Sequence, residues 1–322
     1  MEAEQRGVEW EIIPDSDIVK FTYNGQEGLI RKGVPSTNLS IASRICAHKN
    51  LTRTMLREAG LPIMKGFALR SSDTPEYRNE VFSALQKPLV VKPAASTQGD
   101  GVKLNIKTLE EMNAHVDFLF NTVSSKTLLN PGLVLVEESA LGSEYRIVVT
   151  QEKVLAVMNR KPASVMADGE HTIQQLIDVK NTDELRNISD VMYPHITPDD
   201  DLITNLKEQG LTLDSIPAKD QHVVMRKISN IMAGGDAYDI TDDVHPSVME
   251  IGMKTIQAIP GMSFVGLDFI STDIYADQST QQCAVIEVNS APGYAMHDYP
   301  MYGKKRFIAF NVLKLLFPEL QQ

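Results

Sequence analysis

Two short polar motifs near the end of the chain could bind a metal ion. Asp268 lies in the segment GLDF, and Glu287 and Asn289 lie in AVIEVNSAPG. Side chains two apart on a strand share a face, so Glu287 and Asn289 project together, and Asp268 joins them if the strands pair. Two carboxylates and an amide form the oxygen set that Mg²⁺ prefers. A solvated face is the alternative, but an unpaired carboxylate in an apolar strand is costly, which favours the metal.

A lysine in an apolar strand, followed by a glycine-containing loop, is the second candidate feature. Lys92 ends the run VVK, and the loop STQGDG follows it with Gly99 and Gly101. Buried lysines are rare unless paired, and the backbone N–H groups of such a loop can point at phosphate oxygens. Neither GxxxxGK[ST] nor GxGxxG occurs in the chain. By itself the loop fits a plain hairpin equally well.

Further basic residues lie in or beside apolar strands and helices: Lys49, Arg146, Arg160 and Arg226. The planar guanidinium suits phosphate and carboxylate. For each residue alone, a structural salt bridge is the first alternative. Together with Lys92, the set is better explained by an anionic ligand. No HExxH or GxSxG motif occurs and the histidines do not cluster, so His297 is either structural or a substrate contact.

Alternating strand and helix patterns would position these residues, and the predicted fold class is α+β with antiparallel neighbours. Residues 1–38 are typical of short strands and turns, with Asn24-Gly25 as a hairpin turn. Strands are predicted at 63–69, 88–92, 102–106, 133–137, 143–150, 153–160, 263–271 and 282–289. Helices are predicted at 39–59, 74–86, 247–259 and 304–317, with another opened by a Thr108–Glu111 capping box.

Composition narrows the class of protein. The 322 residues carry a net charge of −11, which argues against nucleic acid or an anionic membrane as partner. The first residues, MEAEQRGVEWE, lack the apolar core of a signal peptide. No apolar run approaches the ~20 residues of a membrane span. Two cysteines give no disulfide framework, and we expect a cytoplasmic protein.

In their order, the motifs resemble the ATP-grasp superfamily, and within it the amide ligases related to cyanophycin synthetase and to the glutathione-synthetase half of bifunctional glutathione-forming enzymes. The resemblance runs from about residue 40 to 317. It implies two α+β subdomains that grip ATP between antiparallel sheets, behind a short N-terminal segment. The matching segments are HKNLTRTMLREAGLPIMKG, VVKPAASTQGDGV, VEESALGSEYRIVV, NRKPASVMADGEHTIQQLI, VVMRKISNIMAGGDAYDITDDVHP, GLDF and EVNSAPGYAMHDYPMYGKKR.

The resemblance implies a nucleotide site. Lys49 and Lys92 match the lysines that hold the ATP phosphates. Glu137 and Glu138 fall where the linker strand meets adenine, and Glu144 matches the acid on the ribose hydroxyls. The flap that closes over the phosphates corresponds to Ser96, Thr97, Gln98, Gly99 and Gly101.

It also implies metal, catalytic and substrate positions. The residues that match ligands of Mg²⁺ (or Mn²⁺) are Asp268, Glu287 and Asn289. The residues that match groups near the transferred phosphoryl group and the acyl phosphate are Arg160, Arg226 and Asn230. The candidate substrate contacts are Arg146, Gly234, Gly235, Gly293 and His297.

The implied activity is an ADP-forming, ATP-dependent ligation of a carboxylate and an amine, from amino acids or short peptides. Phosphoryl transfer makes a mixed anhydride that an amine can attack, and cations stabilise the transferring group. A peptide-elongating ligase and a non-catalytic ATP-binding module are the alternatives. The completeness of the motifs argues against the module.

The resemblance also implies a division of the chain. We expect a short N-terminal segment at 1–45, the small lid subdomain and linker at 46–138, and the catalytic subdomain at 139–322 with a helical insertion at about 171–218. Relatives carry a substantial domain before the matching part, so the substrates and the need for a separate partner protein stay open. Relatives commonly form dimers or larger assemblies, which leaves a homo-oligomer open too.

Overall fold

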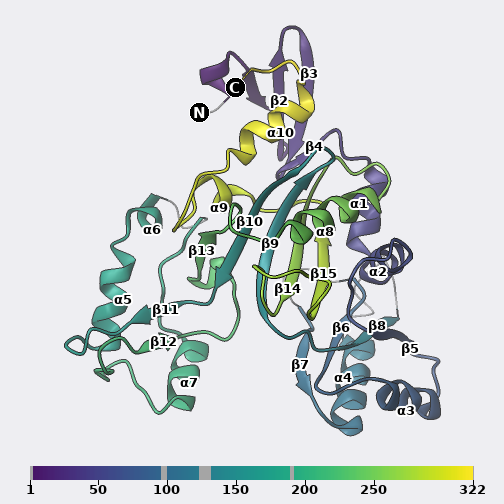
Figure 1. Cartoon of the computed structure of the whole chain (residues 1–322), viewed down its shortest axis with the longest axis vertical. Coiled ribbons are helices and arrows are strands. Elements are labelled where there is room, and N and C mark those ends of the chain that lie inside the picture. The colour runs from purple at the N-terminus through teal and green to yellow at the C-terminus, as the bar shows by residue number, and fades with distance from the viewer. Residues whose placement is uncertain (1–2, 96–99, 123–131, 189–191, 322) are drawn as a thin grey trace.

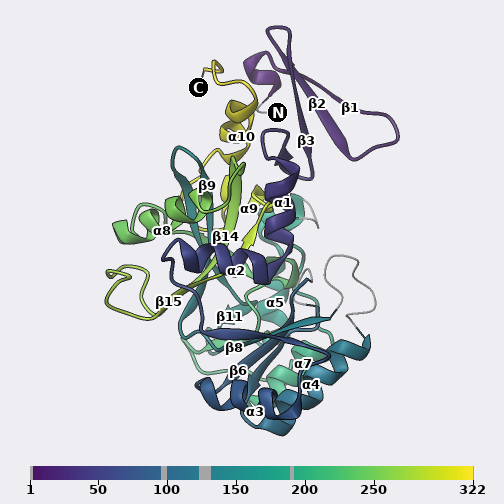
Figure 2. The same cartoon turned by 90° about the vertical axis from the view of Figure 1, so that its right-hand side faces the viewer.

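The fold is built around a central antiparallel sheet, with three smaller units attached to it (Figures 1 and 2). The computed structural model describes residues 3–95, 100–122, 132–188 and 192–321. The central sheet has the strand order β13-β10-β9-β14-β15. Its strands are β9 (Ser143–Thr150), β10 (Val154–Lys161), β13 (Asp236–Asp239), β14 (Phe264–Ser271) and β15 (Cys283–Asn289).

The two faces of the central sheet differ in chemistry. One face carries Ile147, Val157 and Leu267 and packs under α8 (Pro246–Gln257) in the main hydrophobic core. On the other face, Val148 and Phe264 pack under α10 (Ile308–Leu316), but the residues further along the same strands are charged. Alternation along each strand therefore leaves a polar area beside an apolar one.

The lid sheet is a separate four-stranded sheet with the order β5-β8-β6-β7. Two helices, α3 (Pro75–Ala84) and α4 (Leu109–Thr122), pack against it and share one apolar cluster. The predicted capping box of α4 is confirmed, because Thr108 and Glu111 exchange backbone-to-side-chain hydrogen bonds of 3.1 and 3.2 Å. The strands are β5 (Gly66–Arg70), β6 (Leu89–Pro93), β7 (Lys103–Ile106) and β8 (Leu133–Glu138).

The N-terminal sheet packs against α10 at one end of the molecule (Figure 1). A short 3₁₀ turn (Glu4–Arg6) precedes it, and its strands are β1 (Glu9–Ile12), β2 (Ile18–Tyr23), β3 (Gln26–Arg31) and β4 (Val34–Pro35). The predicted Asn24-Gly25 turn is confirmed: both residues have positive φ, 48° and 77°, and Tyr23 pairs with Gln26 across them. That conformation matches the twist of a two-residue hairpin.

The single helix predicted at 39–59 is wrong, because the chain forms α1 (Ser40–Ala47) and α2 (Lys49–Glu58). His48 has φ −109° and ψ 88°, which breaks the helix, and its Nδ1 accepts a 3.2 Å hydrogen bond from the Leu51 N–H. Its side chain thus caps α2, and Lys49 becomes the first residue of that helix. The last predicted helix also starts later than expected, at Ile308, because Phe307 has φ 52°.

A helical unit lies between β10 and β13 in the chain and has its own apolar cluster. Its elements are β11 (Ser164–Met166), α5 (Ile173–Asn181), α6 (Glu184–Ile188), α7 (Asp200–Glu208) and β12 (His222–Val224). The buried Arg186 attaches it to the central sheet, with Nη2 2.5 Å from Asp236 Oδ1. Helices thus occupy much of the predicted insertion.

The three-part division of the chain stays a prediction. Packing favours a first boundary after Leu61 rather than at residue 46, because Leu56 and Leu61 join the core of the central sheet. Within the described part of the chain, no helix is long and apolar enough to cross a lipid bilayer.

Candidate active site

A row of residues crosses the polar face of the central sheet from one edge to the other. The register pairs Asp239 with Met158, Met158 with Arg146, Arg146 with Asp268, and Asp268 with Glu287. Directly paired residues of antiparallel strands point to the same face. The two predicted acids and one predicted arginine are therefore neighbours on a single surface.

Asp268 lies at the centre of this row, between two arginines. Its Oδ1 is 2.8 Å from Arg146 Nε and 3.0 Å from Arg160 Nη2, and its Oδ2 accepts a 3.2 Å hydrogen bond from Asn289. Burial raises the pKa of Asp268, but the positive charges of Arg146 and Arg160 outweigh burial and hold that pKa below its usual range. Arg160 also pairs with Glu144, the predicted ribose acid.

Glu287 is paired with a lysine of helix α2. Lys49, which is 8% exposed, places Nζ 3.3 Å from Glu287 Oε1 across a small recess between α2 and β15. The backbone N–H of Lys49 donates a 3.0 Å hydrogen bond to the carbonyl of Ala94, the residue directly after β6. One predicted phosphate lysine therefore lies beside the candidate metal ligands and beside the start of the predicted flap.

The other predicted phosphate lysine belongs to a buried ion cluster on the lid sheet. Lys92 Nζ lies 2.6 Å from Glu137 Oε2, and Arg53 Nε lies 2.9 Å from the other oxygen of Glu137. Arg53 also donates a 3.0 Å hydrogen bond to the carbonyl of Met64. Our sequence reasoning missed Arg53. Its position four residues after Lys49, on the same helix face, was the available signal.

The remaining predicted nucleotide contacts are placed only in part. Glu138, the last residue of β8, makes two hydrogen bonds to neighbouring backbone. Its Oε1 accepts a 3.0 Å bond from Gln86 N–H, and its own N–H donates to the Lys65 carbonyl. Gly101 has φ 74°, and its carbonyl lies 2.9 Å from His115 Nε2. The other predicted flap residues, Ser96 to Gly99, lie outside the described residues.

The predicted catalytic pair Arg226 and Asn230 is not joined to Asp268 by any contact among the described residues. Arg226 Nη2 lies 2.8 Å from Asp199 Oδ2 and donates to the Thr197 carbonyl, both in the helical unit. Asn230 Oδ1 accepts a 3.0 Å hydrogen bond from Met232 N–H and caps a 3₁₀ turn (Ile231–Ala233). Their catalytic roles stay predictions.

The predicted substrate glycines have different surroundings. A Cβ on Gly235 would lie 2.6 Å from the Lys161 carbonyl, and Gly234 has φ 86°. The carbonyl of Gly234 accepts a 3.1 Å hydrogen bond from the buried Arg186, so this turn belongs to the attachment of the helical unit. A Cβ on Gly293 would meet no atom of the described residues within 4 Å, in the turn after β15.

His297 is fully buried on α9 (Ala295–Asp298), and neither of its ring nitrogens has a hydrogen-bond partner among the residues that the structure describes. Burial, with the positive charge of Arg146, lowers the pKa of His297 to about 3. The ring is therefore neutral at physiological pH. Buried polar groups are nearly always hydrogen-bonded, which makes this side chain a candidate for contact with a ligand or an ordered water.

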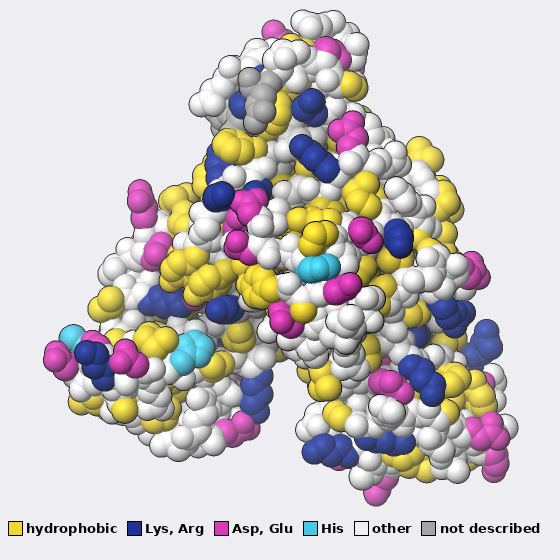
Figure 3. Space-filling model, viewed as in Figure 1, with side chains coloured by type: hydrophobic (Ala, Val, Ile, Leu, Met, Phe, Trp, Pro, Cys, Tyr) yellow, Lys and Arg dark blue, Asp and Glu magenta, His cyan; other side chains and the backbone are white. Residues whose placement is uncertain are grey.

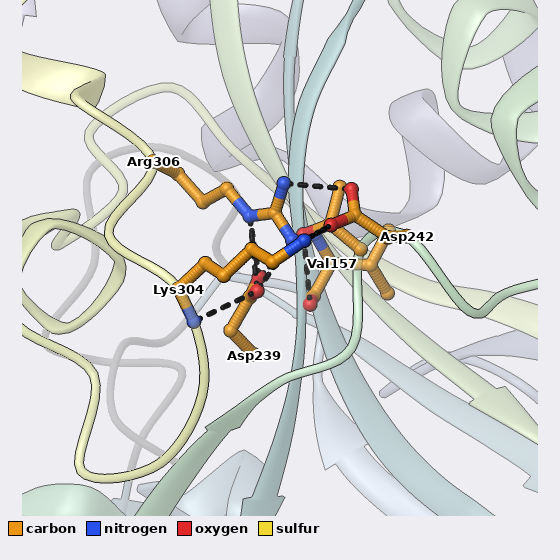
Figure 4. Close-up of polar contacts among 6 residues, drawn as sticks. Val157, Asp239, Asp242, Lys304 and Arg306 are labelled. Carbon is orange, nitrogen blue, oxygen red and sulfur yellow. Dashed lines mark hydrogen bonds and ion pairs between the residues drawn. The ribbon is translucent and has the colours of Figure 1, made fainter.

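A second ion network joins the segment after α9 to the edge of the central sheet (Figure 4). Arg306 lies with Nη2 2.5 Å from Asp239 Oδ2 and Nη1 2.8 Å from Asp242 Oδ1, and Lys304 lies 2.7 Å from Asp242. Asp239 is the first member of the row across the sheet. Sequence reasoning missed this network, since its members are distant in sequence and partner choice depends on the folded chain.

In the space-filling view, the helical unit and the lid sheet form two lobes with a wide notch between them, below the central sheet (Figure 3). Such concave junctions are where nucleotide-sized ligands commonly bind.

The side chains fit a nucleotide and a divalent cation. Asp268, Glu287 and Asn289 supply hard oxygen ligands in adjacent register, and Mg²⁺ usually adds water and phosphate oxygens to one or two carboxylates. Lys49 and Lys92 are both under 10% exposed and suited to phosphate. The described residues hold no group of three or more His, Cys, Asp or Glu around a common point, and the proposed set, with two acids and an amide, needs none.

The two separate antiparallel sheets and the likeness to a solved structure define the class: the chain has the ATP-grasp fold, as predicted. Along 99% of its length it matches a solved bifunctional glutathione synthetase from Pasteurella multocida, with 30% identity and a TM-score of 0.78, covering 43% of that chain. A D-alanine–D-alanine ligase from Coxiella burnetii, 15% identical with a TM-score of 0.50 over 87% of this chain and 57% of its own, shares the fold alone.

Sequence relatives agree with this class. The chain is 33% identical to the bifunctional glutathione biosynthesis protein GshAB of Mannheimia succiniciproducens over 324 residues, which covers 99% of this chain and 42% of the relative. It is 31% identical to cyanophycin synthetase of Crocosphaera subtropica, over 98% of this chain and 35% of the relative. No family model matches the chain. The predicted resemblance is confirmed, although the chain spans less than half the length of these relatives.

Proposed function

We propose that the protein is an ATP-dependent ligase that joins a carboxylate to an amine through an acyl phosphate, releasing ADP and phosphate. The observation that carries this proposal is the row of paired charges on the polar face of the central sheet. Asp268 and Glu287 stand side by side there, with Lys49, Arg146 and Arg160 within 3.3 Å of one of them. Similarity to glutathione- and cyanophycin-forming proteins supports the same chemistry.

In this proposal the cationic side chains contact the phosphates, and the acidic side chains contact the ribose and the adenine end of the site. Lys49 and Lys92 bind the phosphates, one from α2 and one from the lid sheet, so the phosphates bridge the two sheets. Arg146 and Arg160 lie beside Asp268 and stabilise the negative charge that spreads over the transferring phosphoryl group. Glu144 binds the ribose hydroxyls, and Glu137 with Glu138 lines the adenine end of the linker.

A divalent cation, Mg²⁺ or Mn²⁺, would be held by Asp268, Glu287 and Asn289 and would neutralise phosphate charge. After the carboxylate has taken the γ-phosphoryl group of ATP, the amine substrate attacks the carbonyl carbon of the acyl phosphate, and phosphate leaves. The protein supplies no covalent nucleophile in this scheme; its task is to orient the two substrates and keep water from the anhydride.

The substrates we propose are an amino acid or short peptide on each side of the new bond, by analogy with the relatives' products. Since ATP is the co-substrate, we place the reaction in the cytoplasm. Neither nucleic acid nor membrane is needed for it, and a homo-oligomer or a separate partner protein is compatible with the site.

The test is an ADP-release assay with Mg²⁺, ATP and pools of amino acids and dipeptides. We expect ADP release only when a suitable carboxylate and amine are both present. Binding of ATP without ADP release from any pool would contradict the ligase and leave a nucleotide-binding module. Mass spectrometry of the product separates single ligation, which adds one residue, from elongation, which gives a ladder of masses.

A further inference from the structure

The two outer candidate metal ligands lie on an edge strand. Among the described strands of the central sheet, β15 has β14 as its neighbour on one side only, and Glu287 and Asn289 lie near the strand's end. Strand ends at a sheet edge open locally at low cost. Precise placement of Asn289 therefore needs contacts from outside the ladder.

The β14–β15 register ends at the pair Gly266–Asn289. Beyond it, the buried side chain of Asn38 fills the place of the next ladder bonds. Its Oδ1 accepts hydrogen bonds of 2.8 Å from Ser263 N–H and 2.9 Å from Phe264 N–H. Its Nδ2 donates to the carbonyls of Phe264 at 2.9 Å and Ser290 at 3.4 Å. One amide thus joins the start of β14 to the residue directly after Asn289.

The chain around Asn38 is fixed to the same place. Leu39 N–H donates a 2.9 Å hydrogen bond to the Gly261 carbonyl, and the hydroxyls of Thr37 and Ser263 lie 2.7 Å apart. The β3–β4 turn also touches the segment that follows the site, since a Cβ on Gly33 would lie 3.0 Å from the Tyr294 ring. These contacts fix the position of Asn38, so that its side chain can in turn fix the start of β14 and the residue after Asn289.

We propose that Asn38 is a positioning residue for the cation site: it fixes the end of β15, so that Asn289 stays within reach of Asp268. The inference rests on the proposed function and gives the N-terminal segment a part in it. An asparagine is required because the position uses two donor bonds and three acceptor bonds at once, the third acceptor bond coming from the Ser263 hydroxyl at 2.8 Å. An aspartate would set a carboxylate against two carbonyls, and a leucine would leave buried backbone groups unpaired.

The decisive variant is Asn38→Asp, with Asn205→Asp as a matched control. Asn205 is another buried asparagine, 9% exposed on α7, whose Nδ2 donates 2.8 Å to the Val224 carbonyl in the helical unit. Affinity for Mn²⁺ is measured by calorimetry in the presence of a non-hydrolysable ATP analogue, alongside thermal unfolding. We expect Asn38→Asp to weaken Mn²⁺ binding by ~10-fold, the lower end of effects from residues that orient metal ligands.

The control should lose stability without any change in Mn²⁺ affinity. Unchanged affinity in Asn38→Asp, or an equal loss in both variants, would overturn the proposal. Should Asn38→Asp fail to fold, Asn38→Ser replaces it and is judged by the same comparison.

Hydrogen exchange gives a readout that does not depend on metal or nucleotide. Asn38→Asp should speed amide exchange at residues 286–291, and Asn205→Asp should leave that segment unchanged. Equal exchange there in wild type and Asn38→Asp would contradict the positioning role. A wild type that binds neither Mn²⁺ nor the analogue would contradict the proposed function, and the exchange comparison would still decide the role of Asn38.

Discussion

At the scale of single residues, four acids of the candidate site, Glu137, Glu144, Asp268 and Glu287, are each already paired with a cation of the protein. Lys49 faces Glu287, Lys92 and Arg53 face Glu137, and the two arginines face Asp268. In the proposed site, a metal ion would therefore compete with Lys49 for Glu287, and a phosphate would compete with Glu287 for Lys49. Metal and nucleotide would each strengthen the binding of the other, because binding of either one frees the partner of the other.

The first prediction concerns Glu287→Gln. Loss of this charge frees Lys49, so we expect metal-free ATP to bind about threefold more tightly, the size expected for a pair with one partly exposed partner. The enhancement of ATP binding by Mg²⁺ should disappear. Calorimetry with EDTA and with Mg²⁺ measures both, and the control is Glu11→Gln, which removes an acid paired with Lys20 in the N-terminal sheet. Weaker metal-free binding in Glu287→Gln would count against the competition.

The second prediction concerns pH and His297, whose pKa falls from 6.5 to about 3 on folding. Between these values the unfolded chain binds a proton that the folded protein does not bind. The free energy of unfolding therefore decreases as pH falls from 6.5 toward 3, by up to ~1.4 kcal/mol per pH unit. In His297→Phe this contribution is absent. Urea unfolding at several pH values should show a flatter profile for the variant; identical profiles would refute the assignment.

Residues of the site could be predicted where local periodicity decides. Glu287 and Asn289 share a face because they are two apart on a strand, and their pairing with Asp268 followed once two adjacent strands were expected. Arg53 and Arg306 could not be assigned in this way. Their partners, Glu137 and Asp239, are chosen by tertiary packing.

At the scale of elements, the site depends on how β9 and β14 are joined at their ends. Gly142 lies before β9 with φ 117°, and a Cβ there would lie 2.0 Å from the Ser271 carbonyl at the end of β14. Only glycine allows this close approach of two backbones.

The third prediction compares Gly142→Ala with Gly25→Ala. Both glycines have positive φ, but a Cβ on Gly25 would meet nothing within 4 Å in the described part of the chain. Gly25→Ala should lower the free energy of unfolding by ~1–2 kcal/mol, for the strained backbone alone. Gly142→Ala should lower it distinctly more, because the backbones of β9 and β14 must separate. Urea unfolding measures both. Equal costs would show that the strands adjust freely at this end.

Elements were predictable where caps and periodicity agree, as at the Thr108–Glu111 box and the Asn24-Gly25 turn. The break at His48 was not, since 39–59 has helical periodicity throughout. A side-chain cap from a histidine, rather than from Ser, Thr, Asp or Asn, is outside the usual preferences. This break is what places Lys49 at a helix start, facing β15.

At the scale of the whole molecule, a buried ion cluster attaches the helical unit to the central sheet. Asp236 on β13 lies 2.5 Å from both Arg186 and Lys180, and Arg186 also donates to the carbonyls of Pro194 and Gly234. The unit thereby stays in a fixed place beside the notch.

The fourth prediction is that Asp236→Asn destabilises the protein by ~3–5 kcal/mol, because it leaves two cations without their counter-charge. Asp242→Asn is the control: its side chain is 48% exposed beside Arg306, and its loss should change the midpoint of unfolding only slightly. Chemical denaturation compares the two. A similar small effect in both variants would show that the cluster does not stabilise the attachment.

The α+β class followed from the sequence because each motif lies on a recognisable strand or helix, and a helical insertion at about 171–218 was expected. The order of the strands in each sheet was not predicted, and neither was the attachment of the helical unit to the central sheet. It depends on Arg186, a residue of an otherwise polar stretch, and on a glycine pair whose carbonyls that arginine binds.

The most direct test of the central claim follows one oxygen atom. A carboxylate substrate that supports ADP release is labelled with ¹⁸O in its carboxyl group, and the released phosphate is analysed by mass spectrometry. An acyl phosphate requires one labelled oxygen to move from the carboxylate to phosphate for each amide bond formed. Unlabelled phosphate, released in step with product, would contradict the account.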